Sequence, residues 1–295
     1  YYLHPTDQGY SEMIESGYGR CEDITNMATF VARTMAVAIA ADYTPAWAHR
    51  DNNHAWPVQL DKDGRGSAKG NAHAAKVYRK TYAIQREALA FRLPAGMEAP
   101  NRFLKSDTYI DVTDQYAPTT DVTVDVDPEA AEGHGFAYLC VFNGGRWVAI
   151  HWGAIEDGRV TFTDMGRNIC YLPAVFDGES LSAVAPPLIV HRNGAIQRLP
   201  GAGGGADLIA VADGPKKKSP DTGEVTPVSL IKTGETYVLK QWTSTGWSDV
   251  ATVEAGEGPP RFESRPLDGL YWLVRRESRR LERIFTIESG RQRFW

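Results

Sequence analysis

The sequence predicts an α+β fold, in which a small mixed domain is followed by two β-rich domains. Apolar residues such as Met27, Phe30 and Met35 recur at helical spacing between positions 21 and 40. After Pro100 the pattern changes to an alternation of apolar and polar residues, which is typical of strands. These two periods place the main helix near the N-terminus and strands in most of the remaining chain.

Cys21 stands at the start of the expected helix. Gly17 and Gly19 precede it and mark a turn. Glu22 and Asp23 follow it, as acidic residues suited to a first helical turn. The N–H groups and dipole of a helix N-terminus favour the thiolate, which is the nucleophilic form of cysteine. Because the two carboxylates oppose this effect, a histidine partner is the stronger activator. The alternative is a buried, inert cysteine.

A histidine opens the next expected strand. Residues 38–47 are typical of a helix end followed by extended chain, and residues 54–60 alternate as a strand. Residues 61–64 contain a hairpin turn signal. Taken alone, His54 is best interpreted as a hydrogen-bonded structural histidine. Together with Cys21 it becomes a candidate general base for a thiol nucleophile.

The order of cysteine, helix, strand, histidine and second strand resembles the transglutaminase-like superfamily, within the papain-like thiol fold. The matching motifs are Gly19-Arg20-Cys21-Glu22-Asp23 and Asn53-His54-Ala55-Trp56. The resemblance covers about residues 1–90. It implies that Cys21 is the nucleophile and His54 the general base. The family has helices before its cysteine, so this sequence, which starts at Tyr1, is expected to be trimmed at its N-terminus.

The third catalytic residue is expected to be Asn71. The family places an acidic residue on the strand after the histidine, where it holds the imidazole tautomer, but residues 65–71 contain no carboxylate. An amide performs this role in papain-like enzymes, which favours Asn71. Asp61 and Asp63 belong to the hairpin turn. An oxyanion is expected to be stabilised by the Cys21 backbone N–H and a second donor. Three side chains are open as that donor: Gln8, Tyr18 and Trp56.

Three domains are expected. Residues 1–95 form the transglutaminase-like domain, residues 102–200 a β-sandwich domain and residues 222–295 a second one. The Gly-rich and Pro-rich residues 201–221 separate the last two. The C-terminal block resembles the β-modules of secreted bacterial proteins, which implies a secreted, periplasmic or cell-surface location. Its tryptophans are expected in the sandwich cores; exposed on one face, they would stack on a glycan.

Composition limits the partners. The chain has 295 residues, 42% of them hydrophobic and 23% charged, as in ordinary globular proteins. A net charge of −5 argues against nucleic acid as a partner, and no apolar run of about eighteen residues predicts a membrane span. Cys21, Cys140 and Cys170 show no metal-ligand spacing with histidines, so neither a metal nor a cofactor is expected. Cys140 and Cys170 are expected to be buried thiols.

The resemblance implies thiol-dependent acyl transfer or hydrolysis on peptide or glutamine amide bonds, which includes a cysteine peptidase. The expected partner is therefore a protein or peptide substrate. Water as the second nucleophile gives hydrolysis and an amine gives cross-linking, and the sequence leaves both open. The alternatives are a non-enzymatic surface or adhesion protein, favoured by the missing carboxylate, and a glycan-binding protein.

Overall fold

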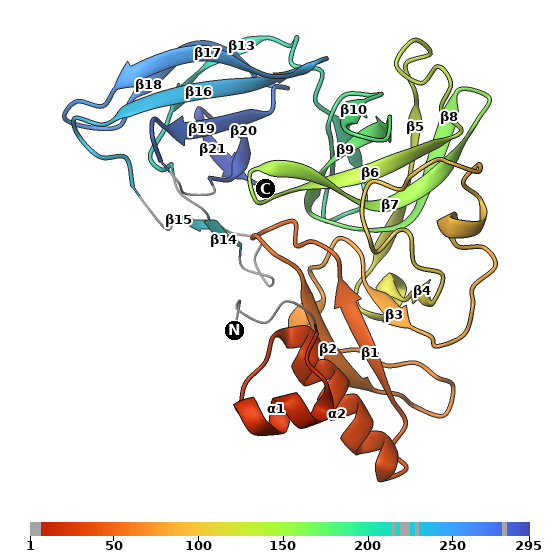
Figure 1. Ribbon diagram of the computed structural model, residues 1–295. Helices are drawn as coiled ribbons and strands as arrows, with labels where there is room; N and C mark the ends of the chain where they lie inside the picture. Colours follow the sequence, from red (N-terminus) through yellow and green to blue (C-terminus); the bar gives the residue numbers. More distant parts are fainter. Residues whose placement is uncertain (1–6, 214–215, 219–224, 228–229, 279–281) are drawn as a thin grey trace.

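The protein is mostly β in its computed structural model, which describes residues 7–213, 216–218, 225–227, 230–278 and 282–295. Strands make up 42% and helices 11%, with only two α-helices in the described ranges. The predicted α+β fold of papain and transglutaminase-like type is therefore wrong. The helical pattern of the sequence is confined to one short stretch, and three large sheets of the described residues follow one another along the chain (Figure 1).

The first sheet has four strands in the order β2-β1-β3-β4. Its strands are β1 (Ile39–Thr44), β2 (His54–Gln59), β3 (Tyr78–Lys80) and β4 (Tyr109–Asp111). Three short 3-10 helices lie beside it in the chain: η1 (Lys69–Asn71), η2 (Leu89–Phe91) and η3 (Thr113–Gln115). Because β4 pairs with β3, this part of the molecule extends past residue 95, where the sequence placed a domain end.

Two helices, α1 (Tyr10–Ser16) and α2 (Cys21–Thr34), precede this sheet, and α2 packs against β1 and β2. The helix begins at Cys21, as predicted. It buries Thr25 and Thr29 but leaves both Ile24 and Phe30 52% exposed, so its large apolar side chains face away from the sheet. Neither helix in the described part of the chain has the length and apolar character needed to cross a bilayer.

The second sheet has eight strands and curls into a nearly closed barrel. Its strands are β5 (Thr119–Asp125), β6 (Phe136–Asn143), β7 (Arg146–Glu156), β8 (Arg159–Gly166), β9 (Ile169–Phe176), β10 (Leu181–Ala183), β11 (Leu188–Val190) and β12 (Ile196–Arg198). Along β6, Leu139 and Val141 enter one buried cluster, whereas Cys140 and Phe142 enter another. This alternation is the two-residue period of the sequence, and it buries both faces of the strand.

The third sheet is also barrel-like and has seven strands. They are β13 (Gly205–Ile209), β16 (Thr236–Thr243), β17 (Gly246–Glu254), β18 (Arg261–Pro266), β19 (Tyr271–Arg275), β20 (Ile284–Glu288) and β21 (Arg291–Phe294). The separate strands β14 (Lys216–Lys218) and β15 (Val225–Pro227) pair with each other. The predicted linker at 201–221 therefore contains β13, and residue 222, the predicted start of the last domain, lies outside the described residues.

Barrels replace the predicted sandwiches because each sheet curls around its own apolar face. A sandwich buries such a face against a second sheet, and the alternating pattern of a single strand is the same in both arrangements. The outer faces of the two barrels meet at Phe142, which lies 5.1 Å from Trp272 and 5.9 Å from Trp247 between ring centroids. None of the eight tryptophans is exposed, so these rings pack the core and do not form an open row for a glycan.

Candidate functional site

Cys21 and His54 line one cavity, here called the Cys–His cavity, of about 660 Å³. Cys21 is the first residue of α2, and His54 is the first residue of β2, against which α2 packs. The loop between β1 and β2, residues 45–53, forms the rest of the wall. The lining residues are Arg20, Cys21, Glu22, Trp47, Arg50, Asp51, Asn52, Asn53 and His54. The structure thus brings the predicted nucleophile and base to the same cavity.

The Cys21 sulfur is a protonated thiol at neutral pH. Burial raises the pKa of Cys21, the backbone N–H of Ala55 acts to lower it, and the Glu22 carboxylate raises it further. The thiol lies 3.2 Å from Glu22 Oε2 and donates a hydrogen bond to it. The helix N-terminus by itself favours a thiolate, but partial burial and the adjacent carboxylate outweigh that effect.

His54 is a neutral base. Burial lowers its pKa, the Arg50 guanidinium lowers it further, and Glu22 acts in the opposite direction. The ring lies between two tryptophans, with centroids 6.1 Å from Trp47 and 5.4 Å from Trp56. Within the described ranges, no hydrogen bond joins this ring to the Cys21 sulfur or to a protein acceptor. The two groups share a cavity without being coupled in the resting state.

Asn71 does not line this cavity. It ends η1, where its N–H donates to Ala68 at 3.0 Å and its carbonyl accepts from the Ala74 N–H at 3.2 Å. In the part of the chain that the structure describes, no hydrogen bond joins it to His54. Residues 65–71 form no strand, contrary to the prediction, and the strand that follows β2 is β3. The turn is as predicted, since Asp61 accepts hydrogen bonds from the N–H groups of two turn residues.

The three candidate oxyanion donors also lie outside the Cys–His cavity. The Gln8 backbone N–H donates to Asp23 at 2.8 Å and its side-chain amide faces the same carboxylate at 3.4 Å. Trp56 Nε1 donates to the Tyr116 hydroxyl at 2.7 Å. Tyr18 is 59% exposed. The backbone N–H groups that act on the sulfur are those of Ala55 in β2 and Glu22 at the start of α2, and they remain as the candidate oxyanion donors.

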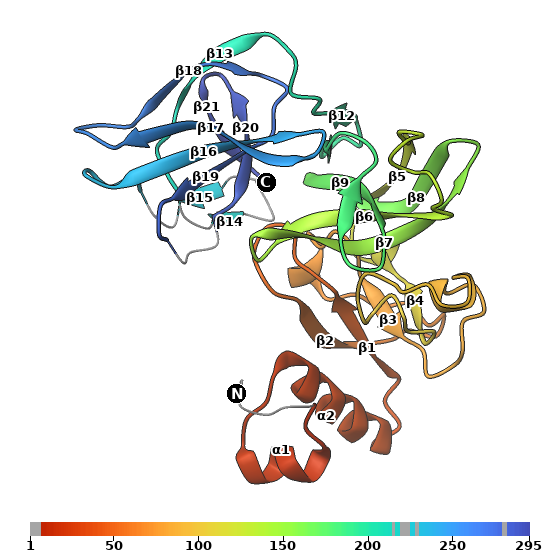
Figure 2. The same ribbon diagram turned by 45° about the horizontal axis from the view of Figure 1, so that its top comes forward.

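The second barrel holds the loop that forms the cavity wall. Asn143 lies at the tip of the β6–β7 hairpin, and its side-chain amide donates to the carbonyls of Trp47 at 2.9 Å, Arg50 at 3.2 Å and Asn52 at 2.9 Å. In Figures 1 and 2 this hairpin reaches across to the first sheet. The adjacent Gly144 N–H donates to Asp51 Oδ1 at 2.7 Å. The sequence shows Asn143-Gly144 only as a turn signal, because its partners lie far away in the chain.

The third barrel reaches the same loop through Arg283. This side chain is fully buried and donates to the carbonyls of Ala48, Phe142 at 2.7 Å and Trp295 at 3.2 Å. Its guanidinium lies 3.7 Å from Asp51. Burial lowers the pKa of Arg283 to about 10, which leaves it charged at neutral pH. One cation therefore connects all three sheets at residues 48 and 51 of the loop.

A buried network of hydrogen bonds joins Trp56 of β2 to Tyr116 and to the ion pair of Asp42 and Arg79. Trp56 donates to Tyr116, which donates to Asp42 Oδ2 at 2.7 Å. Arg79 completes the network with two bonds of 2.8 Å to the Asp42 carboxylate. Because Asp42 and Arg79 face each other across β1 and β3, this ion pair fixes the register of the strands beside His54.

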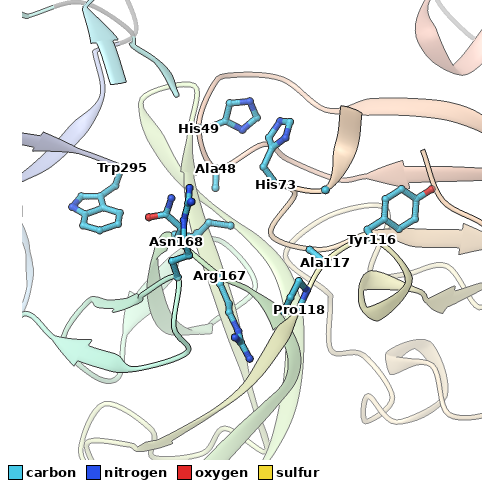
Figure 3. Close-up of a pocket in the computed structure, with 12 residues that line it drawn as sticks. Ala48, His49, His73, Tyr116, Ala117, Pro118, Arg167, Asn168 and Trp295 are labelled. Atoms are coloured by element: carbon cyan, nitrogen blue, oxygen red, sulfur yellow. The ribbon is translucent and has the colours of Figure 1, made fainter. Parts of the chain in front are cut away.

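A second cavity, of about 320 Å³, is lined by His49, His73 and Arg167 among others (Figure 3). Its His73 ring stacks on Trp47 with centroids 5.1 Å apart, and His49 meets His73 edge-on at 4.1 Å. The Arg167 side chain points away from the histidines and bonds Thr119. No group of three or more metal-ligating side chains occurs among the described residues. The sequence signalled none of this clustering.

Comparison with known proteins adds no relative. Neither a protein-family model, nor a curated protein, nor a solved structure matches this chain.

Proposed function

We propose that the protein is a thiol-dependent enzyme that transfers or hydrolyses acyl groups at amide bonds, with Cys21 as nucleophile and His54 as general base. The observation that supports this most strongly is the shared cavity, in which a cysteine at a helix start and a histidine at a strand start face the same space. A nucleophile and a base that converge on one cavity are the minimum requirement of covalent acyl catalysis.

The protonation states determine how the first step proceeds. The Cys21 thiol turns from Glu22 toward His54, and its proton passes to the neutral imidazole as the sulfur attacks the carbonyl carbon. The carbon–nitrogen bond breaks, His54 returns the proton to the leaving amine, and a thioester on Cys21 remains. Water or a second amine then attacks the thioester, with His54 accepting its proton, and restores the thiol. A peptide bond or a glutamine amide meets this chemistry.

The test is the reaction of Cys21 with iodoacetamide at pH 7, followed by mass spectrometry. We expect His54→Ala to slow this reaction at least about threefold, because the base that receives the thiol proton is lost. His134→Ala, in a loop of the second barrel, is the matched control. Cys140 and Cys170 are 0% and 3% exposed and serve as slow internal references.

An unchanged rate in His54→Ala would rule out the catalytic pair. It would favour the alternative in which this part of the protein is a non-enzymatic scaffold of a surface or adhesion protein, as does the hydrogen bond that the thiol makes with Glu22 in place of His54.

A further inference from the structure

We infer that Arg50 binds a carboxylate of the substrate, so that the acyl compounds taken by the Cys–His cavity are acidic peptides or amides. This inference rests on the proposed function for the identity of the reacting group, but not for the presence of an anion site. Arg50 lines the cavity together with Cys21 and His54.

Every charged side chain of this lining except Arg50 has a hydrogen-bond or ion-pair partner among the described residues. Arg20 pairs with Asp7 at 2.6 Å and with Asp23 at 3.5 Å. The Asp51 carboxylate accepts from the Gly144 N–H and lies 3.7 Å from Arg283.

The remaining acid of the lining is also engaged. Glu22 accepts from the Asn53 amide at 2.6 Å and from the Cys21 thiol at 3.2 Å. Arg50 is different, because no described residue forms an ion pair or hydrogen bond with its guanidinium. A cation without an internal counter-charge beside a nucleophile is suited to an anionic ligand.

The protein holds this cation in place without neutralising it. The Arg50 guanidinium lies 4.4 Å from the centre of the Trp47 ring, which is 1% exposed and packs against the rings of His54 and His73. The Arg50 carbonyl accepts from Asn143, so the backbone is fixed as well. A pre-positioned guanidinium loses little entropy when a ligand binds, and it can present two parallel N–H groups to a carboxylate.

Two alkylating probes of almost equal size test this directly. Iodoacetate carries a carboxylate next to its reacting carbon, whereas iodoacetamide carries a neutral amide there. We expect Arg50→Gln to lower the ratio of the Cys21 rates, iodoacetate over iodoacetamide, by about threefold to tenfold, in the range of a partly shielded ion pair. Arg50 also lowers the pKa of His54, and its removal therefore changes the rates of both probes by the same factor. That factor cancels when the iodoacetate rate is divided by the iodoacetamide rate.

Arg50→Lys keeps the charge and is expected to keep most of the ratio. Arg65→Gln is the matched control, because Arg65 lies in the exposed turn after β2 and pairs with Asp114. Protection from iodoacetamide then identifies the source of the carboxylate. N-acetylglutamate α-amide offers a side-chain carboxylate, N-acetylalanine a terminal one, and N-acetylalaninamide none.

The outcomes separate the two proposals. If Arg50→Gln leaves the ratio of the iodoacetate rate to the iodoacetamide rate unchanged, the carboxylate site is overturned. This conclusion does not depend on the result for His54→Ala. A ratio that falls while His54→Ala leaves the iodoacetamide rate unchanged supports the site and removes the catalytic pair. Protection by either carboxylate above that by the neutral amide supports the site, and equal protection by all three compounds counts against it.

Discussion

At the scale of single residues, the cavity combines two neutral groups that are ready to exchange a proton. Partial burial raises the pKa of Cys21 and lowers that of His54, which suits a proton transfer that accompanies attack. Glu22 opposes this arrangement, because it raises the pKa of both groups and accepts the thiol hydrogen bond. Glu22 is thus the residue that keeps the nucleophile in its resting form.

Glu22→Gln is expected to lower the pKa of Cys21, since it removes a negative charge beside the sulfur while keeping a side chain of the same shape. The rate of Cys21 alkylation, measured as a function of pH, should then reach its midpoint at a lower pH than in the parent protein. Glu15→Gln, on the exposed side of α1, is the control. A profile that does not move would show that Glu22 has no influence on the thiol.

At the scale of elements, the loop of residues 45–53 depends on a hairpin that is distant in the sequence. The two hydrogens of the Asn143 amide serve three loop carbonyls. The loop in turn carries Trp47 and Arg50, which form the wall of the Cys–His cavity. The shape of the cavity is therefore set by the second barrel as much as by α2 and β2.

Asn143→Ala is expected to cost about 1–3 kcal/mol in the free energy of unfolding, because it removes the side-chain donor from the buried Trp47 carbonyl and from the partly buried carbonyls of Arg50 and Asn52. The measurement is urea denaturation, and hydrogen exchange should show faster opening of residues 45–53 than in the parent. Asn193→Ala, in an exposed turn of the second barrel, is the comparison, since Asn193 accepts a hydrogen bond from the Ala195 N–H two positions away. Equal stability of the two variants would contradict an anchoring role for Asn143.

At the scale of the whole molecule, the three sheets behave as parts of one packed structure. Lys76, after η1, is fully buried, pairs with Asp111 and donates to the Thr163 carbonyl at 2.6 Å in the second barrel. Tyr78 of β3 donates to the Ile150 carbonyl at 2.8 Å. Arg283 adds the third barrel to these contacts. The β-barrels are therefore structural partners of the cavity.

Arg283→Met is expected to destabilise the protein by about 3–5 kcal/mol, because three buried carbonyls and Asp51 lose their cation. Urea denaturation followed by tryptophan fluorescence measures the loss. Arg276→Met, at an exposed site after β19, should change stability little. If the two variants unfold at the same urea concentration, the three sheets do not depend on this connection.

The local elements of this protein could be predicted from its sequence. Cys21 at a helix start, His54 at a strand start and the buried Cys140 and Cys170 follow from capping signals and from periods of two or 3.6 residues, which involve near neighbours. The turn at Asp61 is of the same kind, since its hydrogen bonds join residues a few positions apart.

How these elements combine could not be predicted, because it depends on contacts between segments that are distant in the chain. The closure of sheets into barrels, the exposed face of α2 and the position of Asn71 outside the cavity depend on pairings between distant segments. Asn143 and Arg283 belong to this group, because their partners in the loop lie more than ninety positions away in the chain. Local patterns carry no information on such contacts: an asparagine before a glycine predicts a turn, and only the packed molecule brings its amide to the loop beside His54.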